Sequence, residues 1–99
     1  MEKDEILKGL DAFAKLAKQD ILKSAVVSDR EYWEQNAKAR YEKYKELYKN
    51  IEEKGIDETL KIAIEEYKLI GESSDAISRG RKRALESFFV LLGIDPSQI

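Results

Sequence analysis

Apolar residues recur every three or four positions along most of the chain. Near the start the series is Ile6, Leu10, Phe13 and Ala17, and this spacing places the side chains on one face of an α-helix. A β-strand would need strict alternation of apolar and polar residues, which no segment sustains. The periodicity therefore predicts an all-α fold built from amphipathic helices.

Residues that favour helix ends divide this pattern into four segments. Ser28 and Glu31 have the spacing of a capping box, in which each side chain satisfies a free backbone N–H group of the other residue. Gly55 and Gly71 suit the ends of helices, and Asp57 suits the start of the third. We expect helices at about 4–26, 29–54, 58–70 and 74–92, of which the first two are long.

The breaks between these helices are short, which favours an antiparallel bundle in a single domain, 1–99. The two long helices should extend beyond the two short ones by about 10 Å or more, given a rise of about 1.5 Å per residue. That overhang would offer a surface for dimerisation or for a partner. At the other end of the fourth helix, Gly93 should let Ile94 fold back on Phe88 or Phe89.

The composition excludes several kinds of chemistry. The 99 residues contain no histidine and no cysteine, so no imidazole base, disulfide, thiolate nucleophile or zinc-finger site is possible. The 18 basic and 20 acidic residues give a net charge of −2, which provides no overall attraction to nucleic acid or to anionic membranes. We expect no cofactor and no bound metal.

No apolar run approaches the length of about 20 residues that a membrane span needs. The longest runs from Phe88 to Leu92, and the first residues are rich in acidic side chains rather than arranged as a signal peptide. We therefore expect a cytoplasmic protein that does not contact membranes.

Aromatic residues form the first candidate binding feature. Trp33, Tyr41, Tyr44 and Tyr48 follow the apolar stripe of the second helix, and both Trp and Tyr are enriched at protein-binding hot spots. They could instead pack within the chain. The candidate partner or oligomer surface comprises Trp33, Tyr41, Tyr44, Tyr48, Phe88 and Phe89.

The fourth helix gives a reason to expect self-association. From Phe88 to Leu92 its apolar residues point in all directions, and a helix that is apolar all round is buried all round. A bundle of four helices has little chain with which to cover that end, so we expect a homo-oligomer, most simply a dimer. The alternative is that the first helix covers it within the monomer.

The sharpest charge feature is the basic cluster Arg79, Arg81, Lys82 and Arg83. It lies in a segment of net charge +1 (73–99), whereas the preceding segment (55–72) has a net charge of −3. Consecutive residues on a helix point in different directions, so we expect no single basic stripe. The cluster could be a solvated face that pairs with the acidic third helix, a nucleic-acid contact or a contact for an acidic protein. Gly80, inside the cluster, is expected to permit close helix packing rather than to act as a hinge.

Two pairs of carboxylates have the three-residue spacing that could hold Mg²⁺: Glu31 with Glu34, and Glu72 with Asp75. All-helical nucleotide pyrophosphohydrolases use such pairs. Here the second pair spans a predicted break, and 13 glutamates produce such spacings by chance.

The sequence thus favours a non-enzymatic, self-associating module that binds and regulates another protein, of the size and style of a small bacterial or phage-encoded protein. The first alternative is a nucleic-acid-binding regulator that uses Arg79, Arg81, Lys82 and Arg83. The second is a Mg²⁺-dependent all-α nucleotide phosphohydrolase that uses the two carboxylate pairs.

Overall fold

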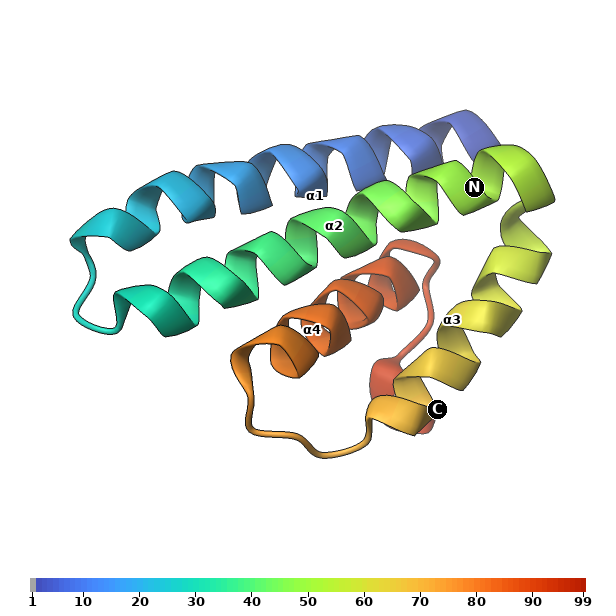
Figure 1. Cartoon of the computed structure of the whole chain (residues 1–99). Helices are drawn as coiled ribbons and strands as arrows, with labels where there is room; N and C mark the ends of the chain where they lie inside the picture. The colour runs from blue at the N-terminus through green and yellow to red at the C-terminus, as the bar shows by residue number, and fades with distance from the viewer. Residues whose placement is uncertain (1) are drawn as a thin grey trace.

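The computed structural model describes residues 2–99 and contains four α-helices joined by short connections (Figure 1). Between residues 2 and 99 there is no strand, and the predicted all-α bundle is confirmed. The predicted boundaries are close to the observed ones, except that the first helix ends three residues early. The α-helices are α1 (Lys3–Lys23), α2 (Arg30–Lys54), α3 (Ile56–Ile70) and α4 (Ala76–Leu91), with 3-10 turns η1 (Ser24–Val26) and η2 (Pro96–Gln98).

Helix α2 lies in the middle of the molecule, with antiparallel α1 on one side and α4 on the other (Figure 1). The Nδ2 atom of Asn36, near the start of α2, donates a hydrogen bond of 3.3 Å to the carbonyl of Ala76, the first residue of α4. These two helices therefore begin at the same end, and Figure 1 shows that they run in the same direction.

Helix α3 leaves the end of α2 at a steep angle because a single residue joins them (Figure 1). Gly55 has φ 87°, a value that glycine adopts without strain, and one residue is too short to turn the chain back alongside α2. The expectation that Asp57 caps α3 is wrong. Gly55 occupies the N-cap position, its carbonyl accepts a hydrogen bond from Thr59 Oγ1 at 2.8 Å, and Asp57 lies in the first turn.

The predicted capping box at Ser28 and Glu31 is also not formed. The chain leaves α1 through η1, so α2 begins only at Arg30. Asp29 is then the N-cap residue, and its side chain makes no capping hydrogen bond. Glu31 lies in the first turn, where its charge still favours the positive end of the helix dipole.

Helix α4 begins two residues after its predicted start, and its C-terminal end follows the sequence-based expectation. Asp75 is the N-cap residue, and its side chain accepts a hydrogen bond from the backbone N–H of Ser78 at 2.9 Å. At the other end, Gly93 has φ 80°, and the N–H of Ile94 donates to the carbonyl of Phe89 at 2.8 Å. Ile94 thereby folds back and packs against the core.

The cap at Asp75 makes the stability of α4 depend on pH. Hydrogen bonds from the hydroxyl of Ser73 and the backbone of Ser78 lower the pKa of Asp75 from 3.8 to about 2. Because the folded-state pKa is depressed, the stabilisation is present above about pH 4 and is lost as the pH falls toward 2.

We therefore expect the melting temperature of the wild-type chain to fall more steeply between pH 4 and pH 2 than that of an Asp75→Asn variant. Asparagine also caps helices but does not titrate. Thermal unfolding followed by circular dichroism at stepped pH measures the difference. Parallel curves for the two proteins would show that this cap does not contribute to the acid sensitivity.

The core lies where α1, α2 and α4 meet, and α3 covers one end of it (Figure 1). Phe88 and Phe89 are completely buried there, with 0% of their surface exposed. The other large members of this cluster are Ile6, Leu10, Tyr44, Leu47, Ile51 and Leu85.

This burial corrects the prediction that Phe88 and Phe89 belong to a partner surface. The chain covers them itself, because the fold-back at Gly93 brings Ile94 and Ile99 against the same core. Phe88 and Phe89 therefore give no argument for self-association, although Val90 in the same apolar run is 63% exposed.

The overhang predicted for the long helices is present at the start of α2. Asn36 is level with the first residue of α4, so residues 30–35 extend beyond it by about 9 Å at 1.5 Å per residue. The overhanging turn carries Tyr32 and Trp33.

Candidate functional site

A hollow of about 800 Å³ lies beside this overhang, and we call it the α2–α4 hollow. Glu72 and Ser73, in the connection between α3 and α4, form part of its lining. The start of α2 contributes Asp29, Tyr32, Trp33 and Asn36. Helix α4 contributes Arg79, Lys82, Arg83 and Glu86.

The four residues from each helix have the spacing i, i+3, i+4 and i+7, which places them on one helical face. This corrects the expectation that the basic cluster forms no stripe. Arg79, Lys82 and Arg83 share a face, and only Arg81 points elsewhere, with its Nε atom 4.0 Å from Glu66 Oε2. The structure thus brings Trp33 of the predicted aromatic stripe together with Arg79, Lys82 and Arg83 of the predicted basic cluster.

Trp33 is the broadly exposed member of the predicted aromatic stripe. Its side chain packs edge-on against Tyr32, with ring centroids 5.1 Å apart, yet 44% of its surface remains exposed. By contrast, Tyr44 is buried against Phe13, and Tyr41 and Tyr48 are half-buried against the core. The predicted surface is therefore reduced to Trp33, and the tyrosines after it mostly hold the helices together.

Two of the four cations have partners within the chain. Lys82 Nζ donates a hydrogen bond of 2.9 Å to the carbonyl of Gly71 and lies 5.6 Å from the centre of the Tyr67 ring, while Arg81 lies near Glu66. These contacts agree with the interpretation that the cluster pairs with α3. Arg79 and Arg83 make no side-chain hydrogen bond or ion pair with any residue from 2 to 99.

A buried polar network fixes the position of the hollow. Asn36 is 4% exposed; besides its bond to Ala76, it accepts a hydrogen bond of 2.9 Å from Arg40 Nε. Arg40 also pairs with Asp20 of α1 at 2.9 Å. The network therefore connects α1, α2 and α4 next to the overhanging residues 30–35. This network was not predicted, because nothing in the sequence distinguishes Asn36 and Arg40 from the exposed polar residues of α2.

Glu86, at the far end of the hollow, is held by α3. The hydroxyl of Tyr67 donates to Glu86 Oε2 at 2.7 Å. Burial of the hydroxyl and this hydrogen bond raise the pKa of Tyr67 to about 12, so the donor stays protonated at neutral pH. One oxygen of Glu86 is engaged in this way, and the other accepts no hydrogen bond from residues 2–99.

A second missed feature is a buried lysine that connects α2 to α3. Lys43 is 6% exposed, and its Nζ atom pairs with Glu66 at 2.8 Å and with Glu46. The other oxygen of Glu66 has no hydrogen-bond partner in the part of the chain that is described. No pattern in the sequence indicates that this lysine, one of thirteen, is buried.

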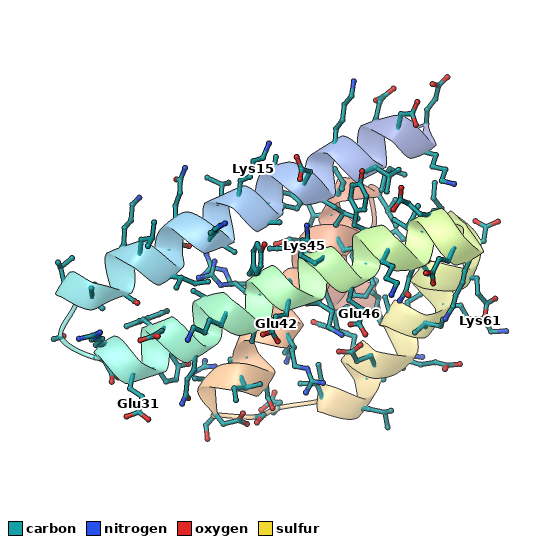
Figure 2. The ribbon with its side chains drawn as sticks, turned by 45° about the horizontal axis from the view of Figure 1, so that its top comes forward. Lys15, Glu31, Glu42, Lys45, Glu46 and Lys61 are labelled. Atoms are coloured by element: carbon teal, nitrogen blue, oxygen red, sulfur yellow. The ribbon has the colours of Figure 1, made fainter. Side chains whose placement is uncertain are left out.

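The four carboxylates considered for Mg²⁺ lie in different surroundings, and Glu72 lines the α2–α4 hollow. Glu31 points away from the bundle at the start of α2 (Figure 2), and Glu34 pairs with Lys38 at 3.0 Å, which lowers its pKa. Asp75 caps α4. Across residues 2–99, no three acidic side chains come close enough together to hold a metal ion, so the two pairs do not form a shared site.

The fold and the site together define a small all-α bundle whose central helix overhangs a mixed-charge hollow. Comparison of the chain with protein-family models, curated proteins and solved structures finds no match. Within the described residues, no helix has both the length and the apolar character required to span a membrane.

Proposed function

We propose that the chain is a non-enzymatic protein-binding module of regulatory type and that it binds its partner through the α2–α4 hollow. The observation that supports this most strongly is the convergence of exposed Trp33 with Arg79 and Arg83, since Trp, Tyr and Arg dominate binding hot spots. The two arginines have no carboxylate partner of their own and are free to pair with one on another protein. The proposed setting is the cytoplasm, where proteins rarely depend on disulfides, and the absence of cysteine agrees with this.

The charge of the hollow favours a protein over a polyanion. Its three cations are accompanied by three carboxylates, from Asp29, Glu72 and Glu86. A nucleic-acid groove needs an excess of cations, because affinity comes mainly from neutralised phosphates. A protein surface presents charges of both signs and can pair with both.

The function can be tested by capturing partners from host extract on the immobilised chain. We expect a Trp33→Ala/Arg79→Ala variant to lose at least about 90% of the captured partner, because hot-spot residues each contribute about 2 kcal/mol or more. The matched control is Leu69→Ala/Lys61→Ala on α3, which also removes one exposed apolar and one exposed basic side chain. Equal capture by the two variants, or no capture by the wild type, would contradict the proposal.

The arrangement of Arg79, Lys82 and Arg83 beside Trp33 favours one second candidate, a nucleic-acid-binding regulator. This function would be established by duplex DNA binding that weakens steeply with salt and is lost in an Arg79→Ala/Arg83→Ala variant. If the chain does not bind duplex DNA at low salt, this candidate function is excluded.

A further inference from the structure

Helix α3 has no large apolar side chain that is fully buried. Its two buried residues are the small Thr59 and Ala63, and its larger apolar side chains are half-buried at the edge of the core. By contrast, α1 buries Leu10 and α4 buries Phe88, each with 0% of its surface exposed. Local opening is easiest where few buried apolar contacts hold an element, so α3 is the helix that can separate from the bundle at the lowest cost.

The connections of α3 allow it to move as a unit. Gly55 alone joins it to α2, has φ 87°, and has no atom within 4 Å of the position that a Cβ would occupy (Figure 1). Such a position can absorb a change in backbone angles and act as a hinge. At the other end, residues 71–75 lead to α4 and can span about 17 Å when extended. The end of α3 at Ile70 can therefore move while α4 stays in place.

Polar contacts hold the end of α3 that lies away from Gly55. Three hydrogen bonds connect residues 66–71 to α2 and α4, and we call them the α3 latch. They join Lys43 Nζ to Glu66 Oε1 at 2.8 Å, the Tyr67 hydroxyl to Glu86 Oε2 at 2.7 Å, and Lys82 Nζ to the carbonyl of Gly71 at 2.9 Å. Closure of α3 thus depends on a few side-chain contacts at one end.

The α3 latch is also incomplete. The Oε2 atom of Glu66 is buried and accepts no hydrogen bond from the described residues. The nearest cation, Arg81, has its Nε atom 4.0 Å away, which is too long for a hydrogen bond. A buried acceptor without a donor is unfavourable, and opening would return this oxygen to water. That gain offsets part of the stabilisation that the α3 latch provides.

Two side chains of the α3 latch, Lys82 and Glu86, also line the α2–α4 hollow. They lie four residues apart on one face of α4, so without Tyr67 and Gly71 they can pair with each other. We propose that α3 is a hinged flap, which opens about Gly55 while α1, α2 and α4 remain folded, and whose closure fixes these two charges in the hollow. The inference does not rest on the proposed function, because opening needs no partner.

Opening can be measured by the rate at which buried thiols react with iodoacetamide, since the natural chain has no cysteine. The variants Ala63→Cys on α3 and Ala17→Cys on α1 are matched, because each alanine is 1% exposed. We expect the thiol at position 63 to react at least about 100-fold faster, because it needs only local opening. Its rate should also rise less steeply with urea, since less surface is exposed when only α3 opens.

Hydrogen exchange of the unsubstituted chain provides a second measurement that no cysteine can disturb. Amides in residues 60–70 should exchange faster than those in residues 40–51 of α2. Equal rates and equal urea dependence for the two thiols, together with equal amide exchange in the two segments, would overturn the proposal. The helix α3 would then separate only when the whole chain unfolds.

The role of the α3 latch is tested by Tyr67→Phe in the Ala63→Cys chain. Loss of a hydrogen bond to a charged carboxylate should speed the reaction of the thiol about tenfold. The matched control is Tyr48→Phe, which removes the hydroxyl of another half-buried tyrosine, one that makes no hydrogen bond with residues 2–99. It should change the rate by less than about twofold. If both substitutions have the same effect, the hydroxyl of Tyr67 does not hold α3 closed and the proposed latch is wrong.

Discussion

Replacing Phe88 with alanine is expected to destabilise the fold by about 4 kcal/mol, the upper range for truncation of a large buried side chain. Phe88 is 0% exposed and lies at the centre of the cluster that joins α1, α2 and α4. Because a domain of this size is stable by only about 5–15 kcal/mol, the variant should be close to unfolding at room temperature. Urea denaturation followed by circular dichroism measures the loss.

Leu69→Ala is the control, since Leu69 is 87% exposed on α3 and lies outside the core. It should change the free energy of unfolding by no more than about 0.5 kcal/mol. The comparison also decides between the two interpretations of the phenylalanines. A Phe88→Ala chain that remained as stable as the wild type but lost association would support the original prediction of a partner surface.

The second large effect is expected for Gly80→Ala. A Cβ atom at this position would lie 2.5 Å from the backbone oxygen of Asn36 and 3.0 Å from Ala39 Cβ. In an isolated helix the substitution would be favourable by about 1 kcal/mol. Here α2 and α4 would have to move apart, and we expect a net loss of about 2 kcal/mol, because overpacking costs about 1–3 kcal/mol or more.

Gly9→Ala provides the control for this experiment. Its Cβ would also lie close to a neighbour, at 2.8 Å, but that neighbour is the end of the flexible Leu91 side chain rather than backbone. Leu91 can rotate away, so the change in stability should stay within about 1 kcal/mol. Equal losses for the two variants would show that the backbone contact of Gly80 does not limit the packing of α2 against α4.

The features that could be predicted from the sequence are those that depend on residues close together in the chain. Periodic apolar residues predicted the helices, Gly93 predicted the fold-back of Ile94, and Gly80 predicted a close helix contact. The predicted caps at Ser28 and Asp57 were wrong because the actual start of a helix depends on how the chain leaves the previous one. A 3-10 turn after α1 and a single glycine after α2 shifted both boundaries.

The candidate site was harder to predict because it is formed by residues of different helices that come together only in the tertiary structure. Trp33 and Arg79 are far apart in the sequence, and they come together only because α4 packs parallel to α2 with its start level with Asn36. The spacing of Arg79, Lys82 and Arg83 did contain a usable signal, since i, i+3 and i+4 share a face. Arg81 lies on a different face, so the four basic residues taken together do not show this shared face.

The most direct measurement of the proposed binding site is photo-crosslinking from within the α2–α4 hollow. A photoreactive phenylalanine derivative is placed at Tyr32, which lines the hollow, and in a second protein at Leu69, which is 87% exposed on α3. Both proteins are irradiated in host extract. We expect one protein to be crosslinked from position 32 and not from position 69. The same adduct from position 69, or a partner that is captured but never crosslinked from position 32, would contradict the proposed site.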